Sequence, residues 1–212
     1  MFAIYGEVCK KNLKIFLFPV ALSVLLIPVI LFFITDLHNS SMFVAGKLCQ
    51  RFFSISGIFL LSSIFAPEQR DNVEETLLTK AVPLRAVYVI RFVEALLALV
   101  LYTAVFIGLL VLLGGVELEF TRLFIHTLAP ALLLGGLGMA GTRFGGNIGV
   151  GCMIAFGFLM IQHFFPIEIT KYFHIFTLEG EYSVIMVYLC AFAFVLISFI
   201  KGAKIGVRKK NS

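Results

Sequence analysis

The sequence predicts an all-α membrane protein with six transmembrane helices, an N-terminal interfacial helix and a short cytoplasmic helix between the second and third spans. Of the 212 residues, 60% are hydrophobic and 14% are charged, and the mean hydropathy of +1.04 lies outside the range of soluble globular domains. The apolar runs are about 20 residues long, as a helix needs to cross a hydrocarbon core about 30 Å thick. Alternating segments of about 10 residues, typical of membrane β-strands, do not occur. Residues 1–212 are expected to form one transmembrane domain.

The predicted elements follow from where apolar runs begin and end. Residues 1–14 place apolar side chains ahead of Lys10, Lys11 and Lys14, a pattern typical of an interfacial helix that leads into the bilayer. Residues 114–121 and 142–147 are predicted to be tight turns, and residues 201–212 a basic cytoplasmic tail. The six predicted spans are residues 15–35, 48–66, 87–113, 123–141, 148–165 and 183–200.

The basic residues are distributed unequally between the two predicted sides. Thirteen of the 17 lie on the side of both termini and of residues 67–86: Lys10, Lys11, Lys14, Arg70, Lys80, Arg85, Arg91, Arg143, Lys201, Lys204, Arg208, Lys209 and Lys210. Lys47, Arg51, Arg122 and Lys171 lie on the other side. Because cytoplasmic segments of membrane proteins carry excess Lys and Arg, both termini and residues 67–86 are predicted to be cytoplasmic. The positive net charge therefore indicates orientation in a membrane, and no nucleic-acid partner is expected.

Residues 67–86 form the one long polar segment of the chain. Their apolar residues recur at helical spacing: Val73, Leu77, Leu78 and Ala81. Asp71 and Glu74 have the spacing of a capping box, and Pro83 disfavours helix at the residue before it. The segment is therefore predicted to contain an amphipathic helix on the membrane surface.

Glu74 and Glu75 are the one adjacent pair of carboxylates, and such pairs can serve acid and base chemistry. Membrane proteases of the prenyl-endopeptidase type also require an arginine four residues after the second glutamate, where this chain has Thr79. A solvated helix face is therefore favoured over an active site, and no catalytic residue is assigned. An intramembrane hydrolase that uses Glu74 and Glu75 stays as the alternative.

The glycine-rich stretch Gly136–Arg143 lacks the lysine and the following serine or threonine that a phosphate-binding loop needs. Any ATP must then be bound by another subunit, and the glycines are predicted to allow close helix packing. The four cysteines lie far apart without CxxC spacing, so no metal site is expected.

Glu94 is the deepest ionisable residue, about two turns into the third predicted span. A charge at that depth is costly and marks a candidate pathway or gating residue. The other interpretation is structural, because Arg91 lies three residues earlier on the same face and can pair with Glu94. Both interpretations stay open at this point.

The polar segment and its place after the second of six spans resemble the ABC type-2 exporter permeases, the membrane subunits of the type V ABC transporter fold. The loop of that family begins with a glutamate and ends in a Leu-Leu and Pro pattern before the third helix. The matching positions here are Glu68, Arg70, Glu75, Leu77, Leu78, Pro83 and Arg85.

The resemblance implies that residues 67–86 hold a coupling helix that docks on a separate cytoplasmic ABC ATPase, present in two copies. The residues expected at that contact are Glu68, Arg70, Glu74, Glu75, Leu77, Leu78, Pro83 and Arg85. It also implies a second permease protomer, identical or different, in a bacterial plasma membrane. ATP and Mg would bind to the ATPase, so this chain would hold no cofactor and catalyse no reaction.

The 24 phenylalanines and the few charges inside the spans favour a hydrophobic or amphipathic cargo. A peptide of the antimicrobial type is the leading expectation, followed by a drug or a lipid-like molecule. A membrane protein that uses the polar segment only for docking, without transport, is the third class considered.

Overall fold

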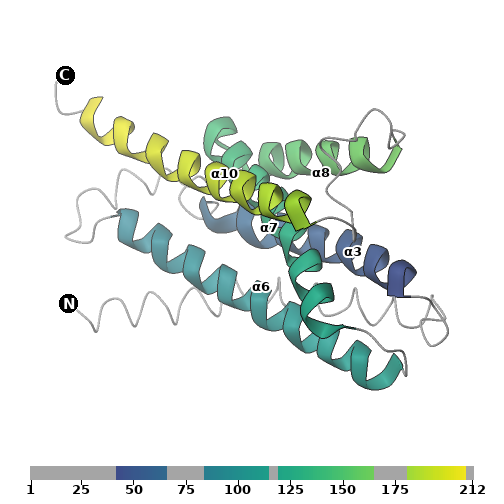
Figure 1. Ribbon diagram of the computed structural model, residues 1–212. Helices are drawn as coiled ribbons and strands as arrows, with labels where there is room; N and C mark the ends of the chain where they lie inside the picture. The colour runs from purple at the N-terminus through teal and green to yellow at the C-terminus, as the bar shows by residue number, and fades with distance from the viewer. Residues whose placement is uncertain (1–41, 66–83, 115–118, 165–180, 209–212) are drawn as a thin grey trace.

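The computed structural model describes residues 42–65, 84–114, 119–164 and 181–208, and all of its elements there are helices (Figure 1). The prediction of an all-α chain is confirmed for this part. The first predicted span, the interfacial helix and the predicted helix after Pro67 lie outside the described residues. The elements are α3 (Met42–Ser62), η3 (Ser63–Phe65), α6 (Leu84–Gly114), α7 (Phe120–Gly145), α8 (Ile148–Phe164) and α10 (Glu181–Arg208).

Two of the described helices are long and apolar enough to cross a membrane. They are the stretch Ala86–Gly108 of α6 and the whole of α7, Phe120–Gly145. The other described helices contain shorter apolar runs: Cys49–Phe65, Ile148–Gln162 and Val184–Ile200. The count of six spans stays a prediction.

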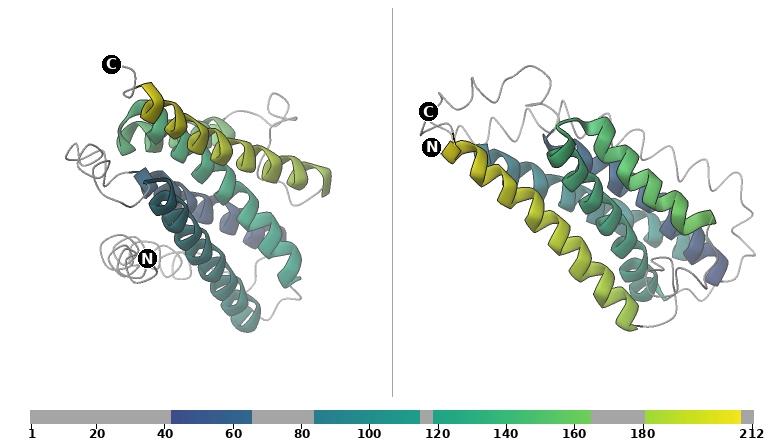
Figure 2. Two further views of the ribbon diagram at one scale, coloured as in Figure 1. Left: turned by 90° about the vertical axis from the view of Figure 1, so that its left-hand side faces the viewer. Right: turned by 90° about the horizontal axis from the view of Figure 1, so that it is seen from above.

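α7 is the central helix of the described bundle. It contacts α3, α6, α8 and α10, and 78% of its spanning window is buried, against 28% for α6. The helices lie side by side with α7 between α3, α8 and α10 (Figure 2). A shift of any other described helix therefore alters its contact with α7.

The chain passes repeatedly between two ends of the bundle. At one end α3 and η3 finish, α6 begins, α7 turns into α8 and α10 finishes; we call this the near end, on the left in Figure 1. At the opposite, far end, α3 begins, α6 finishes and α7 begins. Both ends of the segment 66–83 are consequently attached at the near end.

Small residues bring α7 into backbone contact with its neighbours. A Cβ added to Gly135 would lie 2.6 Å from the carbonyl oxygen of Gly57 in α3, and one added to Gly136 would lie 3.2 Å from the carbonyl oxygen of Ala191 in α10. A Cβ on Gly141 would lie 2.9 Å from the Cα of Gly151 in α8. The packing role predicted for these glycines is confirmed, because any side chain would separate the helices.

Several predicted boundaries differ from the structure. α6 begins at Leu84, so residues 84–86 of the predicted loop 67–86 are helical. The turn predicted at 114–121 is wrong at both ends, because Gly114 ends α6 and α7 begins at Phe120. α3 begins at Met42, earlier than the predicted span 48–66. The turn predicted at 142–147 is wrong at its start, because Thr142 Oγ1 donates to the Gly138 carbonyl at 2.9 Å and the helix continues to Gly145. It stops at Gly146, whose φ of 67° is the left-handed conformation that glycine adopts most easily. α10 continues to Arg208, so the start of the predicted tail is helical. Polar residues can extend a helix beyond its apolar run, which the hydropathy pattern alone does not register.

Candidate functional site

The predicted coupling residues are mostly outside the part that the structure describes. Arg85 lies in the first turn of α6. The remaining ones fall within 66–83: Glu68, Arg70, Glu74, Glu75, Leu77, Leu78 and Pro83. The structure does describe the two points where this segment leaves and rejoins the bundle. Those points contain a cluster of aromatic rings and arginines that we call the near-end cluster: Phe65, Tyr88, Arg91, Arg143 and Phe199.

Aromatic rings from three parts of the chain meet in this cluster. Phe65 at the end of η3 packs edge-on against Tyr88 of α6, with 4.9 Å between the ring centroids and 77° between the planes. Phe199 of α10 packs edge-on against both Phe65, at 6.3 Å, and Phe92 of α6, at 5.9 Å. Each such pair stabilises by about 0.5–1.5 kcal/mol beyond area burial. Phe65 and Tyr88 are nearly fully buried, so these contacts fix both attachment points of 66–83.

Arg143 brings the end of α7 into the cluster. Its guanidinium carbon lies 5.1 Å from the ring centroid of Phe65 and 5.7 Å from that of Tyr88, within the range of cation–π attraction. Arg143 is in the last turn of α7, where a positive charge also interacts favourably with the helix dipole. One guanidinium therefore contacts the last described residue before 66–83 and a residue in the second turn after it.

Arg91 joins the start of α6 to η3, the short helix that follows α3. Its Nη1 donates a hydrogen bond to the carbonyl oxygen of Ile64 at 3.2 Å, and the side chain is buried. The last carbonyls of a helix have no partner within the helix, so this donor satisfies one of them. Arg91, predicted as a possible pathway or gating residue, thus belongs to the near-end cluster.

Glu94 takes part in none of the contacts that define the near-end cluster. Its Oε1 is buried without a hydrogen-bond partner among the described residues, whereas Nη1 of Arg91 is directed to Ile64. A carboxylate oxygen without a partner in an apolar helix is costly, so Glu94 stays the candidate pathway residue of α6.

Sequence reasoning missed Phe65, Tyr88, Phe199 and the contact role of Arg143. It counted Arg143 only as a basic residue in a turn. The predicted span 123–141 ends before Arg143, so the hydropathy pattern does not place this side chain beside the ends of 66–83. The available signal was an arginine placed just before the Gly145–Gly146 pair, which is typical of the last turn of a helix.

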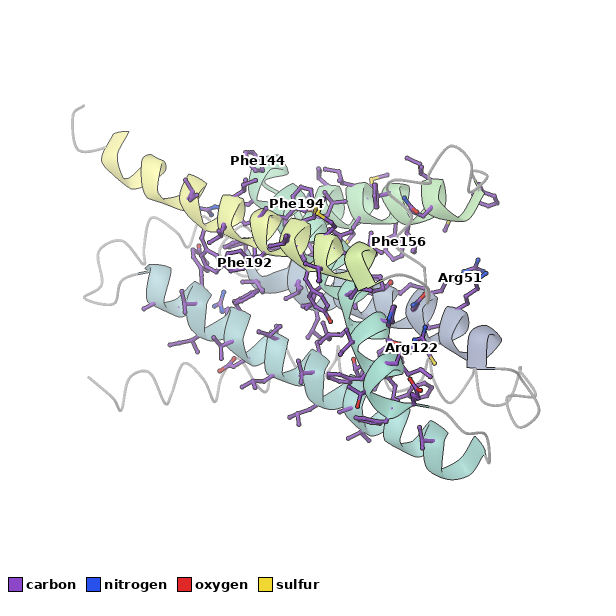
Figure 3. The ribbon with its side chains drawn as sticks, in the orientation of Figure 1. Arg51, Arg122, Phe144, Phe156, Phe192 and Phe194 are labelled. Atoms are coloured by element: carbon purple, nitrogen blue, oxygen red, sulfur yellow. The ribbon has the colours of Figure 1, made fainter. Side chains whose placement is uncertain are left out.

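Toward the far end, the arginines are exposed and not buried among aromatic rings. Arg122 lies in the first turn of α7 and Arg51 in the far half of α3, and both side chains are exposed (Figure 3). The location of Arg122 agrees with the predicted outer end of its span. Arg51 lies further inside its helix than predicted, because α3 begins at Met42. The lipid contact expected for both side chains stays a prediction.

The near-end cluster joins η3, α6, α7 and α10. It combines two cations, aromatic rings and a backbone carbonyl, and none of its five described residues carries a carboxylate. The stretch Gly136–Arg143 lies inside α7 and does not form a phosphate-binding loop. Among the described residues, no group of three His, Cys, Asp or Glu side chains could hold a metal ion. Comparisons with protein-family models, with curated proteins and with solved structures found no match for this chain.

Proposed function

We propose that this chain is the membrane-spanning subunit of an ATP-driven ABC exporter, with residues 66–83 as the segment that contacts a separate ATPase. One observation carries the proposal. Both ends of the most polar segment of the chain are held in one buried cluster at the near end, where Arg143 lies against Phe65 and Tyr88. A segment that receives force needs such attachment on both sides, whereas a surface loop that only connects two helices does not.

The exposed surface of α6 supports a place in the membrane. Apolar side chains with exposed fractions of 45–63% recur at every fourth residue along it: Val89, Val93, Leu97, Leu101 and Val105. A continuous apolar strip of this kind on a water-soluble protein would favour aggregation, and a lipid environment removes that cost. In the proposed arrangement six helices cross a bacterial plasma membrane, and both termini are cytoplasmic.

The proposed mechanism is a change in the relative populations of two packings. Two ATPase subunits close on ATP, move 66–83 and favour either an inward-facing or an outward-facing arrangement of two permease protomers. The second protomer is either another copy of this chain or a related one. The chain contributes no bond-breaking step, and ATP and Mg stay on the ATPase.

The cargo proposed is hydrophobic or amphipathic, with an antimicrobial-type peptide before a drug or a lipid-like molecule. The many phenylalanines of the chain support this class. Glu94 is the proposed polar contact in the pathway, because its Oε1 lacks a hydrogen-bond partner among the described residues.

Co-expression with a candidate ABC ATPase tests the proposal. The complex is purified and reconstituted in liposomes, and ATP hydrolysis is compared between the native chain and the double variant Glu75→Ala, Leu77→Ala. We expect co-purification of the native pair, and loss of either assembly or coupled hydrolysis in the double variant. The double variant Arg51→Ala, Thr121→Ala, changed at the far end, is the control and should behave as the native chain does.

Two outcomes would overturn the transporter proposal. If no ATPase binds and a phenotype depends on Glu74 and Glu75 alone, the hydrolase alternative takes its place. If a partner other than an ATPase is retained through 66–83 and no ATP is hydrolysed, the chain is a docking protein.

A further inference from the structure

We propose that Arg143 is a positioning residue that joins the start of α6 to the central helix α7, so that movement of 66–83 reaches the rest of the bundle. This inference rests on the function proposed above and names the residue through which the movement is transmitted. The juxtaposition that carries it is one guanidinium against the rings of Phe65 and Tyr88, at 5.1 Å and 5.7 Å.

The two attachment points of 66–83 differ in how firmly the bundle holds them. α3 is packed closely on α7, since a Cβ on Gly57 would run into the backbone of Ala131 and one on Gly135 would lie 2.6 Å from the Gly57 carbonyl oxygen. α6 is far less enclosed, with 28% of its spanning window buried. The start of α6 therefore depends on specific side-chain contacts more than the end of α3 does.

Four contacts hold the start of α6, and they lead to η3, α10 and α7. Tyr88 packs edge-on against Phe65 of η3. Arg91 joins it to the Ile64 carbonyl of η3, and Phe92 joins it to Phe199 of α10. The contact between Arg143 and Tyr88 joins it to α7. Removing Arg143 would leave the contacts of Tyr88 with Phe65, Arg91 with Ile64 and Phe92 with Phe199 in place, and would remove a direct connection to the helix that touches every other described helix.

α7 is suited to carry a displacement along its length. Its glycines place it in backbone contact with α3, α8 and α10, with Cβ approaches of 2.6 Å at Gly135, 3.2 Å at Gly136 and 2.9 Å at Gly141. Close-packed interfaces of this kind move as units, because they do not deform continuously. A displacement of α7 at the near end should therefore also move its far end, residues Phe120–His126.

The test measures amide hydrogen exchange in the reconstituted complex of the full chain with its ATPase, without nucleotide and with ATP plus vanadate. In the native complex we expect a nucleotide-dependent difference in deuterium uptake both in 66–83 and in the first turns of α7, 120–126. In Arg143→Gln the nucleotide-dependent difference in 66–83 should persist, while the equilibrium that governs exchange in 120–126 shifts by about tenfold. This lies between the effects of exposed and fully desolvated cation–π contacts, because the Arg143 side chain is only partly buried.

Two further variants separate positioning from general loss of structure. Arg143→Lys keeps the cation but lacks the planar guanidinium, so it should retain part of the response at 120–126. Arg51→Gln makes the same chemical change at an exposed arginine of α3, outside both measured segments, and should keep the full response. Thermal unfolding of each variant shows whether a lost response reflects loss of the folded bundle.

The outcomes distinguish the two proposals. If the native chain binds no ATPase, or 66–83 does not respond to nucleotide, the proposed function fails and the role of Arg143 fails with it. If 66–83 responds but 120–126 does not respond in the native complex, the inference is wrong and the function stands. The same conclusion follows if Arg143→Gln transmits the response as well as the native chain does, or if it loses the response together with the folded state and Arg143→Lys does not restore it.

Discussion

At the scale of single residues, arginines have different surroundings at the two ends of the bundle. At the near end Arg91 is buried and donates to the Ile64 carbonyl at 3.2 Å, and Arg143 lies over two rings. In the far half of α3, Arg51 is exposed. A buried donor to a backbone carbonyl leaves an unsatisfied acceptor when it is removed, whereas an exposed guanidinium leaves water in its place.

The first prediction compares these two environments by the same substitution. Arg91→Ala should lower the free energy of unfolding by about 1.5–3 kcal/mol, the range for a buried hydrogen bond to a charged group. Arg51→Ala should change it by less than about 0.5 kcal/mol, as exposed substitutions usually do. Thermal unfolding of the purified protein in one detergent measures both. Equal losses would mean that the Arg91–Ile64 contact contributes nothing specific to stability.

Two glycines, Gly57 and Gly108, allow a second comparison of the same substitution in two environments. A Cβ at Gly57 would overlap the backbone of Ala131, while a Cβ at Gly108 of α6 has no atom within 4 Å. Gly57→Ala should therefore destabilise by about 1–3 kcal/mol, since backbone atoms cannot yield as a side chain can. Gly108→Ala should be neutral or stabilise by up to about 1 kcal/mol through the better helix propensity of alanine. The same unfolding measurement applies, and an equal response of both variants would contradict the close contact of α3 with α7.

At the scale of the elements, the sequence predicted the existence of every described α-helix better than its ends. The predicted span 87–113 lies within α6 and the predicted span 148–165 nearly coincides with α8, because an apolar run of that length can satisfy its backbone in lipid only as a helix. α7 and α10 continue beyond their predicted spans, to Gly145 and Arg208, because polar residues there still complete helical hydrogen bonds. Packing partners were not predictable, since hydropathy does not record that Phe65, Tyr88 and Phe199 meet.

The exposed strip of α6 gives a prediction about the whole element. Leu97 is 55% exposed, near the middle of the spanning window Ala86–Gly108. Leu97→Asp should disfavour membrane insertion by about 3 kcal/mol, the penalty for aspartate at the centre of a membrane helix. Thr121→Asp, an exposed change in the first turn of α7, should insert normally. The measurement is the fraction of each variant that resists extraction of membranes with alkaline carbonate.

A water-exposed α6 would give the opposite pattern. In that case aspartate at position 97 would replace an unfavourable exposed leucine and would leave the protein equally or more soluble. Retention of Leu97→Asp in the membrane at the native level would therefore contradict a lipid-facing α6.

At the scale of the whole molecule, the near and far ends should lie on opposite sides of a membrane. α7 has 26 residues, so its length of about 39 Å at 1.5 Å per residue exceeds a hydrocarbon core of about 30 Å. Phe120 at its start and Phe144 at its end are both partly exposed, at 41% and 53%. The excess of basic residues on the side of 66–83 predicts that the near end is cytoplasmic.

Single cysteines at these two positions test the orientation, in a chain whose own four cysteines are replaced. In intact cells a membrane-impermeant thiol reagent should label Phe120→Cys, and it should label Phe144→Cys only after the membrane is opened. Labelling of both from outside would show that α7 does not cross the membrane. If only Phe144→Cys is labelled from outside, α7 still crosses the membrane, but 66–83 lies outside the cell, where no cytoplasmic ATPase could reach it. The transporter proposal therefore requires Phe120 outside and Phe144 inside.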